Sequence, residues 1–479
     1  MIPAAPAGRL PAGFAVRLDL RTRRRDGGAT LLGGSPLRLL RLSPRARELL
    51  TTGRVVVGDA TTAELAARLL DAGLAHPDLP PAAADDVTVV IPVKDRPAAL
   101  ARLLAALRAD PAAAGLPVVV VDDGSAVPVP DAPGVRVIRH DRPRGPAAAR
   151  NAGLRAATTP LVAFLDSDCV PRPGWLQRLR PHLDDPRLAV VAPRIAALHS
   201  DGPGWLAPYE TAVSALDMGP RPAAVRPGSA VSYLPSAALL ARRAALAGGF
   251  DEAMRVAEDV DLVWRLTAAG WRVRYEPGAE VAHEHPRTTG KWLRRRAFYG
   301  TGAALLAARH GSAVAPLVIS PETALAWGLA LSGRRWGQAA AGGVLAVTAA
   351  RLARRLAAPE ERPPAGLAAL LVARGVGASG RALARSVTRH HWPLAVPLAL
   401  ISRRARGWVL TAAVADAALA WWPHRQQVGP VRFAVARRLE DLAYGAGLWW
   451  GALRARSTAA LRPVAPPPVS PPARSPGPG

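Results

Sequence analysis

Three continuous apolar runs in the middle of the chain predict strands that are buried on both faces. They cover residues 87–93, 118–121 and 161–165, and such runs are typical of parallel strands. Between the first two, leucines recur at helical spacing at positions 100, 103, 104 and 107, after Asp95 and Pro97. This alternation of strands and helices predicts an α/β domain with a mostly parallel sheet.

The N-terminal region has a different pattern. Residues 14–20 alternate apolar and polar side chains, as in a half-buried strand, residues 25–28 predict a turn, and residues 37–42 a further strand. Ser43-Pro44 opens a short helix, and Thr61 to Glu64 has capping-box spacing before a helix that ends near Gly73. Residues 1–80 are therefore expected to form a small winged-helix-like module, with a generic accessory domain as the alternative.

The last third of the chain predicts helices. Apolar segments at residues 317–331, 339–350 and 407–422 are short or carry Glu322 or Asp416, so none is a clean span of about 20 residues. They can lie on a membrane, span it weakly or form a soluble bundle. We expect a catalytic domain at 85–300, a helical, membrane-associated region at 301–462, and a disordered Pro-rich tail at 463–479.

Charge and cysteine content narrow the setting. The formal net charge is +26, and most of the excess lies after Arg287. Because these basic residues flank apolar segments, an anionic membrane surface is favoured over nucleic acid as their partner. Cys169 is the single cysteine, which excludes an internal disulfide and a Cys-based zinc site. Residues 1–10 do not resemble a secretory signal, so we expect a cytoplasmic protein, associated with the inner face of the membrane.

Carboxylates and small residues follow the predicted strands. Pro92 to Asp95 end the first strand, Asp123 and Gly124 follow the second, Gly145 to Arg150 open a helix, and Asp166-Ser167-Asp168 follow the third. An Asp at a strand end is more often a helix cap than a ligand, and an Asp-x-Asp alone is common. Because ligands bind at the carboxyl ends of such strands, all four in this order predict a binding site for a diphosphate and a divalent cation.

A further acidic run precedes a predicted helix. Glu258 and Asp259 stand at the start of an amphipathic segment that ends near Gly270. Acidic residues in a first helical turn are favoured by the helix dipole, which is the structural interpretation. The functional interpretation is a carboxylate base, for which we choose Asp259, whereas Asp261 is better explained as a structural helix-start acid.

In these five motifs, residues 87–285 resemble a family 2 glycosyltransferase with the GT-A fold. The resemblance implies a Rossmann-like, mostly parallel sheet, a nucleotide-sugar donor such as UDP-glucose, and a Mn²⁺ or Mg²⁺ ion. It implies that Asp95 and Asp123 contact the uridine, and that Pro92, Gly145 and Arg150 also belong to the donor site. It assigns Asp166 to the ribose and the metal, Asp168 to the metal, and Asp259 to the general base. His283 falls where some relatives keep a metal ligand, with His285 as its competitor.

The order of the regions is similar to that of the glycosyltransferases of mycofactocin biosynthesis. That similarity implies an inverting transfer of a hexose, glucose, to a redox-cofactor precursor derived from a ribosomal peptide, with the N-terminal module binding the peptide as an added strand. One alternative is a membrane glycosyltransferase with a lipid or cell-wall acceptor. The other is a peptide-binding protein with an inactive transferase domain. Gly333-Arg334-Arg335-Trp336 lacks the Gln of processive synthases, so long-chain synthesis is not expected.

Overall fold

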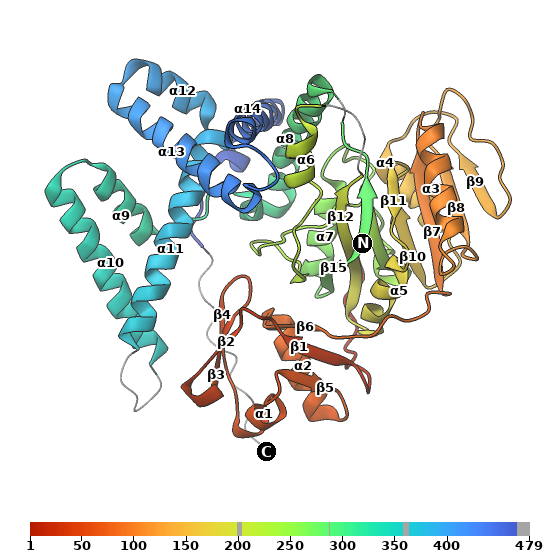
Figure 1. Ribbon diagram of the computed structural model, residues 1–479, viewed down its shortest axis with the longest axis horizontal. Coiled ribbons are helices and arrows are strands. Elements are labelled where there is room, and N and C mark those ends of the chain that lie inside the picture. Colours follow the sequence, from red (N-terminus) through yellow and green to blue (C-terminus); the bar gives the residue numbers. More distant parts are fainter. Residues whose placement is uncertain (199–203, 287, 358–363, 467–479) are drawn as a thin grey trace. The chain divides into compact units, whose positions relative to one another are not determined.

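The computed structural model describes residues 1–198, 204–286, 288–357 and 364–466, in two compact units, Met1–Pro286 and Arg287–Gly479. The first unit holds the small N-terminal module and a large sheet flanked by helices, and the second unit is helical (Figure 1). The predicted α/β class with a C-terminal helical region is therefore confirmed. Most of the predicted disordered tail, 467–479, lies outside the described residues.

The N-terminal module contains two three-stranded sheets and two helices. One sheet has β1 (Ala15–Leu18) between β5 (Arg54–Val56) and β6 (Ala75–Pro77), and the other has β2 (Arg23–Arg25), β3 (Thr30–Gly33) and β4 (Arg38–Arg41). The helices are α1 (Pro44–Leu49) and α2 (Ala60–Ala72). Leu65, Leu69 and Leu70 of α2 are buried in the core of the module. The strands β2, β3, β5 and β6 were not predicted, and the winged-helix assignment stays a prediction.

The predicted capping box at Thr61 is wrong, because α2 begins two residues earlier. Its N-cap is Asp59, whose Oδ1 accepts a 2.7 Å hydrogen bond from the Thr62 N–H, while Thr62 Oγ1 accepts from the Asp59 N–H at 3.0 Å. The short carboxylate of the N-cap residue reaches the N–H three residues later. Thr61 cannot take this role, because it already lies inside the helix.

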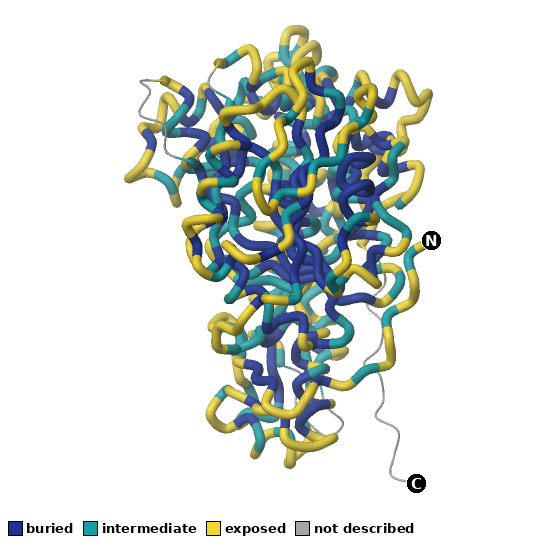
Figure 2. The backbone as a smooth tube through the Cα atoms, turned by 90° about the vertical axis from the view of Figure 1, so that its right-hand side faces the viewer, coloured by how far each residue is buried: buried dark blue, intermediate teal, exposed yellow. Residues whose placement is uncertain are grey.

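The large sheet is mixed, in the order β11-β15-β12-β14-β10-β7-β8-β9, with β13 beside β15. In chain order its strands are β7 (Val87–Val93), β8 (Val118–Asp122), β9 (Val135–Arg139), β10 (Leu161–Leu165), β11 (Cys169–Pro171), β12 (Leu188–Ala197), β13 (Ala223–Ala224), β14 (Ala238–Arg242) and β15 (Arg272–His283). The strands β10, β7, β8 and β9 are parallel, whereas β14 runs antiparallel to β10 and β12. Figure 2 shows the buried strands at the centre of this part.

Helices cover the large sheet and place its loops. They are α3 (Pro97–Ala109), α4 (Pro146–Ala156), α5 (Trp175–Leu179), α6 (Ala207–Ala212) and α7 (Glu258–Ala268). The predicted helices at 97–107 and 258–270 are thus confirmed. Arg272 of β15 joins the sheet to the N-terminal module, since it donates to Asp71 of α2 at 2.7 Å and to Asp185 at 2.9 Å. This buried guanidinium holds the module against the large sheet.

The second unit consists of helices. They are α8 (Thr289–His310), α9 (Pro321–Leu331), α10 (Arg335–Leu356), α11 (Ala365–Arg385), α12 (Trp392–Ile401), α13 (Arg403–Trp421) and α14 (Pro430–Arg454). The helices α8 and α14 approach so closely at Gly447 that a Cβ atom there would lie 1.8 Å from the Ala297 carbonyl oxygen. Since α8 continues past residue 300, it crosses the boundary that we predicted there.

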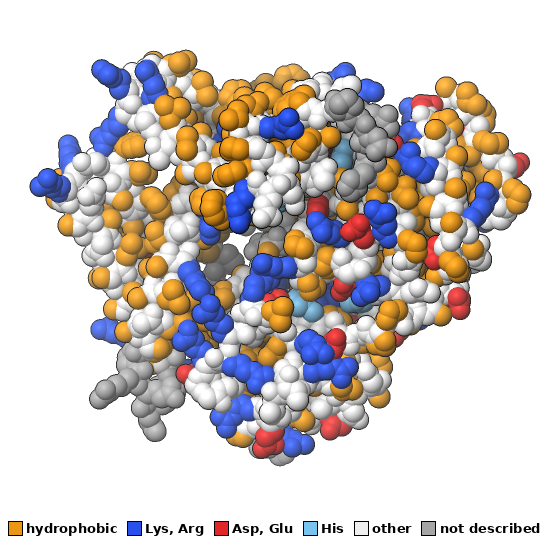
Figure 3. All heavy atoms as spheres, viewed as in Figure 1, with side chains coloured by type: hydrophobic (Ala, Val, Ile, Leu, Met, Phe, Trp, Pro, Cys, Tyr) orange, Lys and Arg blue, Asp and Glu red, His pale blue; other side chains and the backbone are white. Residues whose placement is uncertain are grey.

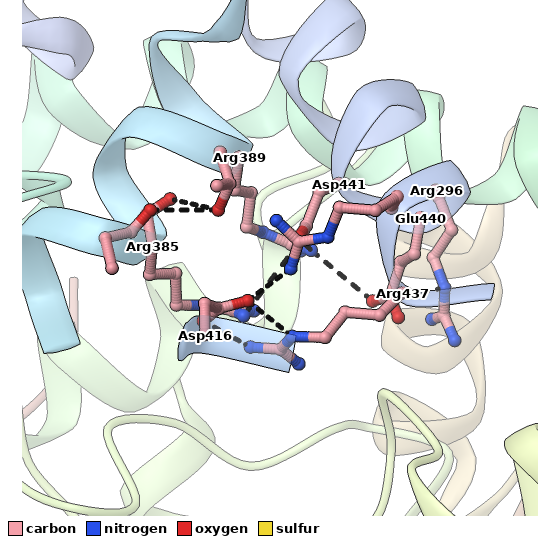
Figure 4. A network of polar contacts seen from close by, with 10 residues as sticks. Arg296, Arg385, Arg389, Asp416, Arg437, Glu440 and Asp441 are labelled. Atoms are coloured by element: carbon pink, nitrogen blue, oxygen red, sulfur yellow. Dashed lines mark hydrogen bonds and ion pairs between the residues drawn. The ribbon is translucent and has the colours of Figure 1, made fainter. Parts of the chain in front are cut away.

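Buried ion pairs hold the helical unit together (Figure 4). Asp416 of α13 accepts hydrogen bonds from Arg437 at 2.6 and 2.8 Å, and Asp441 of α14 accepts one from Arg389 at 2.9 Å. The Asp441 side chain is 1% exposed. Since an unpaired buried charge is costly, these pairs fix how α14 packs against α13 and against the segment Ser386–His390.

Among the described residues, one helix, Ala365–His390, is long and apolar enough to cross a membrane, judged by length and composition alone. The three apolar segments that we predicted overlap α9, α10 and α13 instead. Only 11% of the most apolar part of Ala365–His390 is buried.

Candidate active site

Three acidic motifs meet at one edge of the large sheet. Asp95 follows β7, Asp123 follows β8 and Asp166 follows β10, and β7 pairs in parallel with both neighbours. Their side chains therefore stand at the carboxyl ends of adjacent strands, where α/β sheets bind ligands. Pro92 lies just before this edge, opposite Val121 of β8.

Asp95 links the first two strand ends. Its backbone adopts a left-handed conformation, with φ of +52°. Its N–H donates to Ser125 Oγ at 2.9 Å, and its Oδ1 accepts from the Ala126 N–H at 2.8 Å. Nearby, Asp122 is fully buried, and although burial alone would raise its pKa, hydrogen bonds from Ser125, Val129 and Arg139 lower it. The loop is thus fixed before any ligand binds.

Asp123 holds the loop that leads into α4. Its two carboxylate oxygens accept from the backbone N–H groups of Arg144 at 2.8 Å and Gly145 at 2.7 Å, and Oδ1 also lies 2.8 Å from His140 Nδ1. Gly145 has φ of +99°, a conformation that favours glycine. The structure therefore gives Asp123 and Gly145 a role in shaping the site, and their contact with a donor stays a prediction.

Asp168 and His283 face each other across two paired strands. Cys169 of β11 is the register partner of His283 in β15, and Asp168 Oδ1 lies 3.4 Å from His283 Nε2. Both side chains are under 10% exposed. Arg96 Nη1 also donates to Asp168 Oδ2, at 2.5 Å. His285 points elsewhere, since its Nδ1 lies 3.7 Å from Glu210 Oε2. Of the two predicted histidines, His283 is thus the one beside Asp168.

Arg150 joins two of the predicted acidic motifs. Its Nη2 donates to Asp166 Oδ1 at 2.6 Å and its Nη1 donates to Glu258 Oε1 at 3.0 Å. Its side chain is 4% exposed, and the two carboxylates raise the pKa of the guanidinium although burial opposes this. Arg150 was predicted to bind the donor; here it holds Asp166 and Glu258, and a direct phosphate contact stays a prediction.

Asp259, the predicted base, is tied to the same edge of the sheet. Its Oδ2 accepts from the Ser236 N–H at 3.2 Å and its Oδ1 accepts from the Val260 N–H at 2.8 Å. Ser236 lies just before β14, and the next residue, Ala237, accepts from the Asp166 N–H at 2.9 Å. Burial, together with the charge of Glu258, raises the pKa of Asp259 to about 7. Such a carboxyl can accept a proton near neutral pH.

Asp168 and His283 could hold a cation whose remaining ligands come from a bound substrate. Among the described residues there is no group of three or more His, Cys, Asp and Glu side chains that could hold a metal ion. Asp166, predicted with Asp168 and His283, is instead held by Arg150. The 3.4 Å separation of Asp168 Oδ1 and His283 Nε2 fits two ligands of one ion. Mg²⁺ commonly takes one or two protein ligands and its remaining oxygens from substrate phosphates.

Two residues of the site, Arg96 and Asn151, were not singled out from the sequence. Arg96 contacts Asp168. Asn151 donates from Nδ2 to the Phe250 carbonyl at 2.8 Å and accepts from the Phe250 N–H at 2.8 Å, which fixes the loop before α7. Arg96 and Asn151 directly follow predicted site residues, which is the signal that could have revealed them.

Comparison with known proteins decides the family. Residues 88–246 match the sequence profile of glycosyl transferase family 2. The pre-mycofactocin glycosyltransferase of Mycobacterium tuberculosis is 49% identical over 474 residues, which cover 95% of this chain and 99% of that protein. This chain belongs to glycosyl transferase family 2. The predicted recognition is confirmed, and the mixed sheet is the GT-A-like catalytic domain of a glycosyltransferase.

Other proteins are similar to shorter parts of this family 2 glycosyltransferase. The succinoglycan biosynthesis protein ExoO of Rhizobium meliloti is 34% identical over 178 residues, which cover 34% of this chain and 50% of that protein. Among solved structures, the mannosyltransferase PcManGT of Pyrobaculum calidifontis, in complex with GDP-Man and Mn²⁺, is 19% identical with a TM-score of 0.38, and the match covers 72% of this chain and 90% of that one.

Proposed function

We propose that this enzyme transfers glucose from UDP-glucose to a redox-cofactor precursor derived from a ribosomal peptide, as a step of mycofactocin biosynthesis. The observation that carries the proposal is the 49% identity to the pre-mycofactocin glycosyltransferase across 95% of this chain and 99% of that one. Identity over the full length includes the N-terminal module, residues 1–80, to which we assign recognition of the peptide.

The donor lies along the edge where β7, β8 and β10 end. We assign Asp95 and Asp123 to the uridine, together with Pro92, Gly145 and Arg150, and Asp166 to the ribose. Asp168 and His283 would hold Mn²⁺ or Mg²⁺, which offsets the negative charge that develops on the leaving diphosphate. The 3.4 Å pair of Asp168 and His283 supports this assignment.

Asp259 acts as the general base. It removes the proton from an acceptor hydroxyl while that oxygen attacks the anomeric carbon, and the bond from this carbon to the diphosphate oxygen breaks with its electron pair. A single displacement inverts the anomeric centre, so an α-linked donor gives a β-linked product. Burial and Glu258 support the role, because they raise the pKa of Asp259 to about 7.

A second acceptor class is kept because α12 is exposed and apolar: Leu400 is 72% and Ile401 83% exposed. A membrane glycosyltransferase with a lipid or cell-wall acceptor would place such a helix at the lipid. In either case we place the helical region, with its positive charge, at the inner face of the cell membrane. An inactive transferase domain is disfavoured, since Asp168 and Asp259 are both retained.

The test offers the enzyme both acceptors. The purified full chain is incubated with UDP-glucose, Mn²⁺ and either the modified precursor peptide or a polyprenyl phosphate, and each product is weighed by mass spectrometry. We expect a hexose on the peptide alone, and no product with Asp168→Asn. The matched control is Asp131→Asn, an exposed acid outside the site. Hexose added only to the lipid would reject the peptide-derived acceptor.

A further inference from the structure

The turn between α12 and α13 exposes large aliphatic side chains. None of the ten residues of α12 is buried. The exposed fractions are 53% for Leu394, 53% for Leu398, 72% for Leu400 and 83% for Ile401. A contiguous apolar surface of this kind marks a site of interaction with another apolar phase.

The middle of α13 also exposes aliphatic side chains on one side. Leu410 and Val414 are four residues apart, so they share a face of the helix, and they are 58% and 68% exposed. Asp416 is turned away from that face and pairs with Arg437 inside the unit. The helix α13 therefore has one face that packs within its own unit and one apolar face that does not.

Basic residues stand next to the exposed apolar ones. Arg403, Arg404 and Arg406 begin α13 and are exposed, and residues 392–415 contain no Asp or Glu. Arg404 and Arg406 also donate to backbone carbonyls at the ends of α9 and α12, which hold these two charges at the hairpin without neutralising them. The Arg404 guanidinium lies 4.8 Å from the centre of the Trp408 ring, which is itself 43% exposed. Figure 3 shows hydrophobic side chains together with Lys and Arg on this part of the helical unit. Arg and Trp beside exposed Leu and Ile are typical of segments at a membrane surface.

We infer that the α12–α13 hairpin, residues 392–421, is a membrane-binding element that inserts its aliphatic side chains into one leaflet of an anionic bilayer. Its arginines meet the lipid phosphates, while Asp416 and the buried network stay on the protein side. The helix α12 has ten residues, half the length that spans a bilayer, so the hairpin enters a single leaflet. The inference deepens the proposed membrane association by naming its contact, and it is independent of the sugar acceptor.

An anionic leaflet explains the hairpin better than a protein partner does. Both the aliphatic side chains and the three arginines then find their complement in one lipid, acyl chains below and phosphates above. A second copy of this chain would instead bring the same arginines toward each other, which like-charge repulsion opposes.

The test is flotation of the full-length protein with vesicles of phosphatidylcholine alone or mixed with phosphatidylglycerol. We expect binding to the mixed vesicles. Leu400→Glu/Ile401→Glu should weaken it by roughly a hundredfold or more, because each buried aliphatic side chain contributes about tenfold or more. Replacing Arg403, Arg404 and Arg406 by Gln should also weaken it by roughly a hundredfold, at about 1 kcal/mol for each charge. The matched control, Leu20→Glu, changes a side chain in the other unit that is fully exposed and should bind as the wild type does.

The outcomes separate the two proposals. If the wild type and the Leu400/Ile401 variant bind the vesicles equally well, the hairpin is not the membrane-binding element, although the protein does associate with membranes. If the wild type binds neither vesicle, both fall, and sedimentation of the protein alone then shows whether a second copy covers the hairpin. Donor hydrolysis without acceptor, measured for each variant, shows that the catalytic unit is folded. If the wild type hydrolyses no donor, that result counts against the proposed transferase and not against the membrane-binding hairpin.

Discussion

Arg150 Nη2 donates a 2.6 Å hydrogen bond to Asp166 Oδ1, and this contact ties α4 to the end of β10. The same guanidinium reaches Glu258, the residue before the proposed base. A planar guanidinium holds two carboxylates with separate N–H groups in a fixed geometry, whereas the ammonium of a lysine has three rotatable donors and no such fixed geometry. Arg150 is therefore a positioning residue that connects the donor side of the site with Asp259.

Arg150→Lys and Arg150→Gln should separate position from charge. Both lose the fork, so we expect the transfer rate to fall roughly tenfold to a hundredfold, as when a charge-assisted hydrogen bond worth about 1.5–3 kcal/mol is lost. Only Arg150→Gln also removes the positive charge that lowers the pKa of Asp259. The acidic limb of the pH profile should therefore move to higher pH in Arg150→Gln and not in Arg150→Lys. Measurement of kcat/KM against pH checks this. The exposed Arg155→Gln on the same helix is the control, and the prediction is wrong if all three variants keep the wild-type profile.

Glu258→Gln should shift the pH profile the other way. The charge of Glu258 contributes to the raised pKa of Asp259, so its removal lowers that pKa, and activity should persist to lower pH than in the wild type. Measurement of kcat/KM in buffers from about pH 5 to about pH 9, a range that includes the raised pKa of a buried carboxyl, locates the acidic limb of the profile. An unchanged or alkaline-shifted limb would contradict the role given to Glu258.

Asp259→Asn should slow transfer about 10²–10⁴-fold yet leave the fold more stable at neutral pH. The pKa of Asp259 in the folded protein, about 7, is above its ordinary value of 3.8, so ionising it costs folding free energy as the pH rises between those values. The variant has no such cost. We expect its melting temperature to exceed that of the wild type near neutral pH, and the two to converge at acidic pH. A variant that melts lower than the wild type at every pH would argue against this cost.

His283→Ala should weaken the response to metal more than His285→Ala does. His283 Nε2 faces Asp168 Oδ1 at 3.4 Å, whereas His285 lies by Glu210. Loss of one ligand should raise the Mn²⁺ concentration needed for half-maximal donor hydrolysis by roughly tenfold to a hundredfold, by analogy with disturbed metal sites. Titration of Mn²⁺ into metal-free protein measures it. Equal responses of the two variants would remove His283 from the metal site.

Asp441→Asn should destabilise the helical unit. Its carboxylate is 1% exposed and meets Arg389 and Arg438 at 2.9 and 3.0 Å, and these two arginines also pair with Glu440 and Asp416. Its loss therefore removes one of two carboxylate partners from each arginine, so we expect the unfolding free energy to fall by less than the roughly 3–5 kcal/mol of a fully unpaired buried charge. Urea unfolding followed by tryptophan fluorescence checks this, since the helical unit carries several tryptophans. The control is Glu322→Gln, an exposed acid at the start of α9, and equal midpoints for the two variants would contradict the role of the network.

The sequence predicted the parts of the fold that have a strong periodic signal. The apolar runs at β7, β8 and β10 and the leucine spacing of α3 each have one structural solution, and they place Asp95, Asp123 and Asp166 at one edge. By contrast, β5 and β6 have three residues each, too few for an alternating pattern to be recognised.

Contacts between residues far apart in the chain could not be predicted from the sequence. Arg150 and Glu258 are separated by 108 positions, and only the three-dimensional fold brings them together. The same holds for Arg272, which joins β15 to Asp71 of the N-terminal module, 201 positions away. Residue type alone placed Arg150 among phosphate-binding candidates, because an arginine's partner, phosphate or carboxylate, is decided by its neighbours in space.

The central claim is that Asp259 drives sugar transfer to the peptide-derived acceptor, and one comparison tests it most directly. Wild type and Asp259→Asn are incubated with UDP-glucose, Mn²⁺ and the modified precursor peptide, and the rate of hexose addition is followed by mass spectrometry while donor binding is measured separately. We predict that the variant binds UDP-glucose as the wild type does and transfers hexose about 10²–10⁴-fold more slowly, the usual contribution of a general base. Transfer by Asp259→Asn at the wild-type rate, or no hexose on the peptide with either protein, would contradict the account.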